Sequence, residues 1–324
     1  MHLNFEIVKN LNSFYLLEAE WKNLLARSSI SFSVFMTWEW IVSWLEIYGH
    51  ESHLFVIIGR NENSRVVAIA PLMISTVNIP FFNFDFDYLL FIGDGKRPTP
   101  EYLDFIVAEH YENEIYPLLC DFLIENSPCP LINLRSVIEK SHLIETISKS
   151  ARKKKKESFS RNFSQCPIAT LQNTVERYWK EKSKNFNKKM KEAYRRCERD
   201  LDITIVNCDR VELVDRHIEH LYILHAARWH NQGSARIDKN FINFHKKVSK
   251  KFLEAGWLQL SFLVSHNKFI AGILCYKYLG RYFYYQSGRN PKFNYYNLGL
   301  VIINKTIERA IKEGFKIFDF LTGI

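Results

Sequence analysis

The chain has 324 residues, of which 47% are hydrophobic, 15% aromatic and 24% charged, proportions that are ordinary for a soluble globular protein. No run of about 18 apolar residues and no secretory signal is visible, so we predict a cytoplasmic protein without a transmembrane segment. Six widely spread cysteines without a Cys-x-x-Cys pair argue against a zinc site and a disulfide framework, and no metal is expected. The length predicts two domains.

The net charge of +9 is divided unevenly along the chain. Residues 1–150 carry 10 Lys and Arg against 19 Asp and Glu, a balance of −9, whereas residues 151–324 carry 34 against 16, a balance of +18. This asymmetry predicts a domain boundary near residue 150 and an anionic partner for the second half. Nucleic acid, a phosphorylated cofactor and an anionic membrane surface are all anionic partners of this kind.

The first half predicts an α/β module. Its elements are a strand over residues 3–8, a helix over 14–25, a helix that Thr37 caps, a hairpin around "RNENSR", strands at "YLLFIG" and "YLDFIV", a helix over 112–126 and the strand "LINLRSV". Trp38 falls outside the apolar face of the helix that begins after Thr37. Trp38 is therefore a candidate substrate-binding residue in a groove, with a core aromatic as the alternative.

The second half repeats this order of elements. Three strands over residues 257–288 are joined by tight turns at His266–Asn267 and Leu279–Gly280, and a helix over 298–313 and a strand at "KIFDFLTG" follow. The segments "VVAIAPLM" and "FIAGILCY" occupy equivalent places in the two halves. The chain is thus predicted to hold a duplicated α/β module.

A basic stretch separates the two modules. The segment "ARKKKKESFSRNFSQCP" is charged and rich in serine, which predicts an exposed linker over residues 151–170. Behind it, ten Lys and Arg fall between Arg177 and Arg199, while an apolar stripe from Phe186 to Cys197 has helical spacing. The helix therefore presents an ordered basic row, an anion-binding candidate that contains Lys184, Lys188, Lys191, Arg195 and Arg199. We take Lys184 as a candidate substrate contact.

A helix over residues 211–229 places His225 on its apolar face, with Arg228 three residues further on. A lone inward histidine is commonly a hydrogen-bonded core residue. Here the "HNQGS" loop that follows is expected near the open edge of the module, so His225 is also a candidate site residue.

Gly299 opens the helix over residues 298–313, although glycine in a helix costs about 1 kcal/mol relative to alanine. Ligands of open α/β sheets gather outside the carboxyl ends of strands, where a glycine-bearing helix N-terminus offers backbone N–H groups to a pyrophosphate. Arg289 and Lys292 add positive charge in the preceding loop. The matching helix of the first half opens instead with Glu109, Glu112 and Glu114, so only the second module is expected to bind a phosphorylated cofactor.

The chain resembles the tandem GNAT-like acyltransferases called CelD/BcsL-like or BioF2-like, which are distant relatives of the FemABX aminoacyl transferases. The resemblance covers nearly the whole chain and rests on the combined order of "SKNFNKKMKEAYRRCERD", "LHAARWHNQGS", "FIAGILCYKYLGRYFYYQSG" and "AIKEGFKIFDFLTG", together with residues 35–49. It implies two GNAT-like modules with mixed central sheets flanked by helices, over residues 1–150 and 171–324. The second module is then expected to bind acetyl-CoA or another acyl-CoA as co-substrate.

The resemblance also implies site residues. Gln286, Ser287 and Gly288 would line the channel of the acyl thioester, and Arg289 with Leu298, Gly299, Leu300 and Val301 would hold the pyrophosphate. His225, Arg228 and Asp319 match positions near the acceptor pocket. Direct attack by an amine or hydroxyl on the thioester needs a base, for which His225 or Asp319 is the candidate. It also needs a donor to the thiolate, for which Tyr284, Tyr285 or Tyr296 is the candidate, Tyr285 being our choice.

Three departures from the family pattern are visible. The chain has Gly288-Arg289-Asn290-Pro291 where the family tends to have Gly-Phe-Asp-Pro, and Asn297-Leu298-Gly299 where Ser-Pro-Gly is usual. The sequence also stops at Ile324, where the family continues with closing strands. From this we expect a second module that is truncated and leaves the strand around Asp319 as an exposed edge.

Three functions follow from these patterns. The first is an acyl-CoA-dependent N- or O-acyltransferase that acts on an envelope sugar, a polysaccharide precursor or another small acceptor. The second is an aminoacyl-tRNA-dependent transferase of the FemABX kind, in which the basic helix binds tRNA phosphates, although the long helical insertion of those relatives is not visible. The third is a non-catalytic protein that keeps the fold as a binding module.

Overall fold

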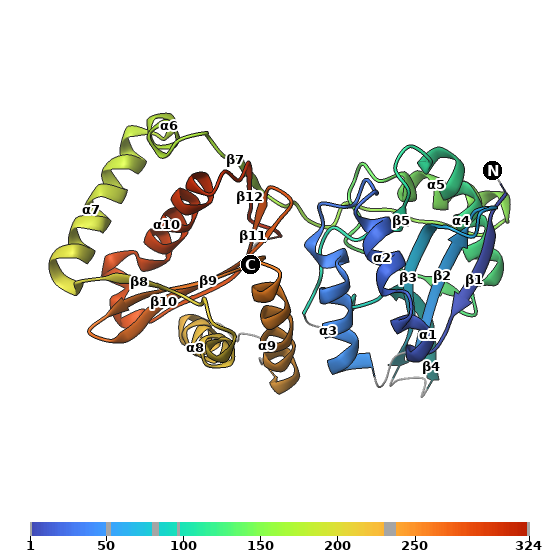
Figure 1. Ribbon diagram of the computed structural model, residues 1–324, viewed down its shortest axis with the longest axis horizontal. Helices are drawn as coiled ribbons and strands as arrows, with labels where there is room; N and C mark the ends of the chain where they lie inside the picture. Colours follow the sequence, from blue (N-terminus) through green and yellow to red (C-terminus); the bar gives the residue numbers. More distant parts are fainter. Residues whose placement is uncertain (1, 50–52, 80–83, 96–97, 230–237, 323–324) are drawn as a thin grey trace. The chain divides into compact units, whose positions relative to one another are not determined.

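The computed structural model describes residues 2–49, 53–79, 84–95, 98–229 and 238–322. The chain divides into two compact units, Met1–Ser164 and Gln165–Ile324, and Figure 1 shows a twisted sheet flanked by helices in each. Within the described ranges, no helix is both long enough and apolar enough to cross a membrane.

Unit 1 is built on a six-stranded sheet in the order β1-β2-β3-β4-β6, with β5 paired to β3. All of its pairs are antiparallel except β4–β6, which is parallel. Its strands are β1 (Asn4–Val8), β2 (His53–Arg60), β3 (Val66–Ile79), β4 (Phe84–Phe91), β5 (Ile106–Val107) and β6 (Leu131–Ile132). Its helices are α1 (Leu11–Tyr15), α2 (Glu18–Leu25), the 3-10 helix η1 (Val34–Met36), α3 (Trp38–Tyr48), α4 (Glu112–Asn126) and α5 (His142–Lys153).

The core of unit 1 is rich in aromatic side chains. The Thr37 hydroxyl accepts a hydrogen bond from the Trp40 N–H at 3.4 Å, as expected for the cap of α3. Trp38 is 5% exposed, with its ring stacked on Phe14 at 4.9 Å between centroids and edge-on to Trp21 at 5.7 Å. Trp38 is therefore a core residue, which corrects its assignment to a substrate groove: the residue lies off the main apolar stripe of α3, but α1 and α2 cover it.

Unit 2 also holds a six-stranded sheet, in the order β7-β12-β11-β10-β9-β8. Its strands are β7 (Ile168–Thr170), β8 (Thr204–Asn207), β9 (Leu258–Ser265), β10 (Lys268–Tyr278), β11 (Arg281–Arg289) and β12 (Ile317–Asp319). Its helices are α6 (Val175–Glu181), α7 (Lys184–Leu201), α8 (Val211–Trp229), α9 (Lys239–Glu254), the 3-10 helix η3 (Pro291–Tyr296) and α10 (Leu298–Lys312).

The two sheets share a pattern of pairing. In unit 2, β11 pairs in parallel with β12 after α10, just as β4 pairs in parallel with β6 after α4 in unit 1. The strands β3 and β10 contain the two segments that the sequence placed as equivalent. The predicted fold class, mixed sheets flanked by helices in two modules, is confirmed.

Helices cover both faces of the unit 2 sheet (Figure 1). On one face, α7 and α10 pack on a core that includes Ile273, Cys275 and Tyr282 of the strands. On the other face, α8 packs on β10 and β11, and α9 packs on β9. The apolar stripe predicted for α7 is confirmed, because Met190, Ala193 and Cys197 are buried and Phe186 packs against them.

The strand around Asp319 is not an edge. β7 pairs with β12 in antiparallel register, with Ile317 opposite Thr170 and Asp319 opposite Ile168. The expectation of an exposed edge is therefore wrong, because a strand from the start of unit 2 occupies that position. Residues 151–170, expected as a linker, contribute both β7 and the last residues of α5.

Candidate functional site

An opening in the unit 2 sheet begins where β12 ends. β11 pairs with β12 over three residues only, from Arg281 opposite Ile317 to Phe283 opposite Asp319. Beyond Phe283, β11 continues to Arg289 with β10 as its paired neighbour. Within the described residues, this side of β11 has backbone groups that no strand pairs, at the carboxyl ends of two parallel strands, where open sheets bind ligands.

A β-bulge lies at the start of this opening. Leu274 of β10 is opposite Gln286, whereas the next residue, Cys275, is opposite Tyr284, so Tyr285 is the inserted residue. The Tyr285 ring contacts His245 of α9 at 5.0 Å and Tyr276 of β10 at 5.1 Å between centroids. Tyr285 therefore lies on the face that α8 and α9 cover.

Tyr284 points to the other face and joins a polar cluster. Its hydroxyl lies 2.6 Å from the Ser287 hydroxyl, and Arg228 Nη1 lies 3.5 Å from the same Ser287 oxygen. Burial raises the pKa of Tyr284, so its hydroxyl keeps its proton at neutral pH. The structure thus places Tyr284, rather than the predicted Tyr285, beside Ser287 and Arg228.

Arg289 lies next to this cluster and adds a second guanidinium. Burial, together with the charge of Arg228, lowers the pKa of Arg289. Arg289 Nε donates a hydrogen bond to Asn294 Oδ1 at 3.0 Å, which fixes the side chain over η3. Two cations held close together repel each other, and an anion bound between them would relieve that repulsion.

The N-terminus of α10 faces Arg289. Asn297, before the helix, adopts the left-handed conformation with φ of 53° and provides no side-chain cap, and no acidic residue lies in the first turn. A Cβ built on Gly299 would meet only the Arg289 side chain, with Nη1 at 3.5 Å. Backbone N–H groups and a guanidinium therefore converge here, as an anion site requires.

The equivalent helix of unit 1 lacks this arrangement. Glu112 and Glu114 occupy the first turn of α4, as the sequence indicated. Carboxylates at that end complement the helix dipole themselves and would repel a phosphate.

His225 is held by the backbone of β11. Its Nδ1 lies 3.0 Å from the carbonyl oxygen of Ser287. A carbonyl only accepts hydrogen bonds, so Nδ1 carries the proton of this bond, and in the neutral imidazole Nε2 then carries the lone pair. This tautomer is the one that a general base uses.

Gly288 lies against α8 and not along an open channel. A Cβ at Gly288 would fall 2.3 Å from the His225 backbone nitrogen and 2.5 Å from the Leu224 carbonyl carbon. Glycine is thus required for the close approach of β11 and α8. This packing role corrects the assignment of Gly288 to the channel wall, while Gln286 and Ser287 remain at the opening.

His245 lies behind Tyr285 in the core. It is fully buried, and burial lowers its pKa to about 3, so the imidazole is neutral. Its Nδ1 lies 3.2 Å from the Tyr276 hydroxyl, and its Nε2 finds no hydrogen-bond partner in the described part of the chain. His245 contributes to the surroundings of Tyr285, and sequence reasoning missed it because α9 was not predicted.

Asp319 is a structural residue. It is fully buried, accepts a hydrogen bond from the Leu321 N–H at 2.9 Å and lies 3.6 Å from Arg281 Nη1. An ion-paired carboxylate between two strands is not accessible to an acceptor. Its assignment as a catalytic base is corrected on this ground.

Lys184 is exposed at the start of α7, whereas the end of α7 lies near the site. Cys197 Sγ is 3.7 Å from the Tyr296 carbonyl, and the Arg196 guanidinium lies 4.7 Å above the ring of Tyr295. Lys184 precedes Cys197 by 13 residues, so it lies about 20 Å along the helix from that contact. The cation that α7 places near η3 is therefore Arg196, which the helical spacing of the basic row had passed over.

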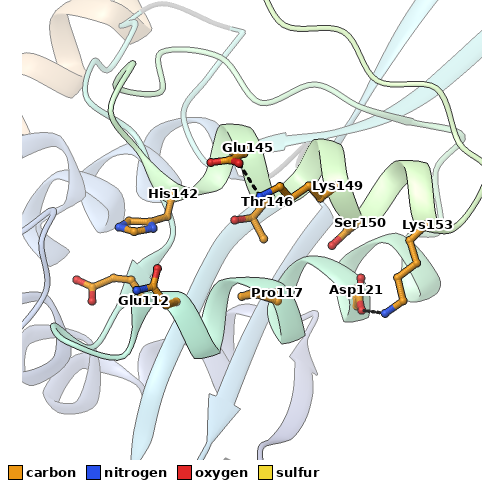
Figure 2. Close-up of a pocket in the computed structure, with 10 residues that line it drawn as sticks. Glu112, Pro117, Asp121, His142, Glu145, Thr146, Lys149, Ser150 and Lys153 are labelled. Carbon is orange, nitrogen blue, oxygen red and sulfur yellow. Dashed lines mark hydrogen bonds and ion pairs between the residues drawn. The ribbon is translucent and has the colours of Figure 1, made fainter.

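Unit 1 has a groove between α4 and α5, shown in Figure 2. Four of its charged side chains are paired, Lys149 with Glu145 at 2.5 Å and Lys153 with Asp121 at 2.8 Å, and Glu112 also lines it. His142 lines the same groove, and its ring stacks on Tyr116 at 5.8 Å. With its charges paired in this way, the groove is a weaker candidate than the opening beside β11.

Comparison with known proteins agrees with this geometry. Residues 184–324 match the family model described as an acetyltransferase (GNAT) domain. The match covers 141 of the 324 residues, all of them in unit 2. The match begins at α7 and includes β11, η3 and α10, the elements that form the opening and the anion site. No curated protein matches the chain.

Solved structures share the fold of the whole chain at low sequence identity. A crystal structure of FemX is 10% identical with a TM-score of 0.61, and the match covers 98% of this chain and 88% of FemX. The C-terminal domain of a putative lysylphosphatidylglycerol synthetase from Agrobacterium fabrum is 9% identical with a TM-score of 0.51, covering 95% and 79%. L-PGS from Bacillus licheniformis is 10% identical with a TM-score of 0.50, covering 93% and 74%. The domain match and this shared fold support the prediction of an acyltransferase.

Proposed function

We propose that unit 2 transfers an acyl group from an acyl-CoA thioester to an amine or hydroxyl of a small acceptor. The observation that carries this proposal is the convergence of Arg289, Arg228 and the first turn of α10 beside the unpaired part of β11. An anionic donor that enters the sheet next to an extended strand fits both features.

The anion site would receive the pyrophosphate of CoA. Gly299 lets the phosphate approach the backbone, the first turn of α10 supplies N–H groups, and Arg289 supplies charge. The pantetheine arm would then run along β11 past Ser287 and Gln286, where backbone groups lack a strand partner. Leu298 and Val301 are buried and hold the start of α10 in the core.

The reaction needs one proton taken from the acceptor and one given to the leaving group. In the proposed step, the acceptor nitrogen or oxygen bonds to the acyl carbon and the carbon–sulfur bond breaks. His225 Nε2 takes the acceptor proton, and the neutral Tyr284 hydroxyl protonates the thiolate. Arg228, next to Ser287, would orient the acceptor or the acyl group.

We propose a small acceptor in the cytoplasm, such as an envelope sugar or a polysaccharide precursor. This choice rests on the resemblance to CelD/BcsL-like proteins, which covers nearly the whole chain. Acetyl-CoA is the simplest donor to test.

Calorimetric titration of the 324-residue chain with acetyl-CoA at low and high salt tests the proposal. The expected result is saturable binding at one site that Arg289→Ala weakens at least tenfold. Lys184→Ala removes an exposed lysine at the far end of α7 and should leave the affinity unchanged. A folded chain that produces no heat with acetyl-CoA would overturn the proposed donor.

A second candidate function uses an aminoacyl-tRNA as donor. It is favoured by the fold shared with FemX and by the exposed basic row on α7, whose Lys188, Lys191 and Arg195 make no ion pair with any described residue. Binding to tRNA would weaken steeply with salt, because each phosphate contact releases a counterion. Weak heat with acetyl-CoA together with steeply salt-dependent tRNA binding would favour this candidate.

A further inference from the structure

Two phenylalanines between α5 and β7 are exposed to an unusual degree. Phe159 is 85% exposed and Phe163 is 82% exposed. Single exposed apolar residues are common on protein surfaces. Here, however, two purely apolar rings lie four residues apart in a segment, residues 156–167, that forms no helix or strand.

The stretch that runs from the end of α5 into this segment, residues 152–163, carries six Lys or Arg and one carboxylate, Glu157. Arg152, Lys155, Lys156 and Arg161 are exposed and form no ion pair with any residue that the structure describes. The guanidinium of Arg161 lies 5.7 Å from the centre of the Phe163 ring, so a cation and an apolar ring are presented side by side.

The neighbouring lysines have a different role. Lys153 is paired with Asp121 at 2.8 Å, and Lys154 is paired with Glu125, both carboxylates belonging to α4. These pairs fasten the start of the segment to unit 1. The cations beyond them remain available to a partner.

We propose that residues 152–163 bind an anionic lipid bilayer. Phe159 and Phe163 would enter the boundary between headgroups and acyl chains, while the four unpaired cations would contact headgroup phosphates. A bilayer offers an anionic layer directly beside an apolar phase, which matches this alternation of charge and phenyl rings. Nucleic acid offers the charge but no apolar phase. The proposal is independent of the acyl transfer assigned to unit 2.

Sedimentation with lipid vesicles tests this proposal on the full chain. Vesicles of phosphatidylcholine alone are compared with vesicles that contain 30% phosphatidylglycerol, on the order of a natural anionic content. The wild type is expected to bind the anionic vesicles selectively, and 0.5 M salt is expected to reduce that binding, because the Debye length falls to about 4–5 Å.

The variants separate the rings from the charges. Phe159→Ala and Phe163→Ala should each lower vesicle affinity about tenfold, the loss expected for one buried phenyl ring. Lys155→Glu with Lys156→Glu should lower it by at least about twentyfold. Leu16→Ala removes an apolar side chain that is 83% exposed outside the segment and should change nothing.

Two results would overturn the proposal. One is equal binding of both kinds of vesicle by the wild type. The other is a double phenylalanine variant that keeps wild-type vesicle binding and loses affinity for a single-stranded RNA oligonucleotide, which would make the segment a nucleic-acid site. Thermal unfolding of each variant confirms that the fold is kept, since all the substituted side chains are exposed.

Discussion

Gly288 of β11 lies directly against the backbone of His225 in α8. A Cβ on Gly288 would be 2.3 Å from the His225 nitrogen, well inside van der Waals contact. The same stretch of α8 is bound through the His225 imidazole to the carbonyl of Ser287. Strand and helix are therefore fixed to each other at the place where the base would act.

Replacing Gly288 with alanine should separate β11 from α8. The clash involves backbone atoms that cannot rotate away, so we expect a loss of about 1–3 kcal/mol in the free energy of unfolding, together with weaker acetyl-CoA binding. For the stability measurement, Gly299→Ala is the matched control, because its Cβ meets only a flexible arginine and alanine favours the helix. Urea unfolding measures both, and equal stability of wild type and Gly288→Ala would contradict the packing role.

Replacing Gly299 with glutamate should abolish the anion site without unfolding the protein. The new carboxylate lies at the N-terminus of α10, where it is favourable for the helix, and pairs with Arg289 in place of a phosphate. We expect acetyl-CoA affinity to fall at least tenfold while the melting temperature is kept. Calorimetry measures the affinity for acetyl-CoA, and an unchanged affinity would show that Gly299 does not contribute to the anion site.

Replacing His225 with asparagine separates the structural role of Nδ1 from the proposed catalytic role of Nε2. The asparagine amide can still donate to the Ser287 carbonyl, but it offers no base at the position of Nε2. The rate of CoA release with an acceptor should drop by about 10²–10⁴, while acetyl-CoA affinity stays within about twofold. His220→Asn, on the exposed side of the same helix, is the control, and an undiminished rate for His225→Asn would exclude it as the base.

Asp104 of unit 1 predicts that the free energy of unfolding depends on pH. It is 4% exposed, accepts hydrogen bonds from the Tyr116 hydroxyl at 3.0 Å and the Phe105 N–H at 2.7 Å, and burial raises its pKa to about 6. The folded state therefore binds a proton more tightly than the unfolded state, and stability from this group is present below pH 4 and lost as pH rises through 6. The shift corresponds to about 3 kcal/mol.

Asp104→Asn should remove this dependence, since both donors meet Oδ1 and an amide oxygen can replace it. The difference in unfolding free energy, wild type minus variant, is expected to decrease by about 3 kcal/mol between pH 4 and pH 7.5. Urea unfolding across that range measures it. A constant difference would mean that Asp104 ionises normally in the folded state.

Local sequence signals predicted much of unit 2. The turns at His266–Asn267 and Leu279–Gly280 have positive φ at all four residues, as tight hairpin turns require. The helix that begins beside Gly299 was predicted as well, because glycine and the apolar period of α10 are both visible within about 15 residues. The short helix α6 and the helix α9 were not predicted, and the apolar face of α9 is interrupted by His245.

Local sequence patterns indicated many of the helices and strands, and also that the second half presents positive charge where the first presents carboxylates. Tertiary structure decided which groups meet at the site, because the bulge opposite Leu274 and Cys275 interrupts the alternation of side chains along β11 and brings Tyr284 and Ser287, three residues apart, to the same side of the strand. It also decided that β7 covers β12, a pairing between residues about 150 positions apart. The direction of each side chain depends on the register with the neighbouring strand, and the sequence of one strand does not specify which strand pairs with it.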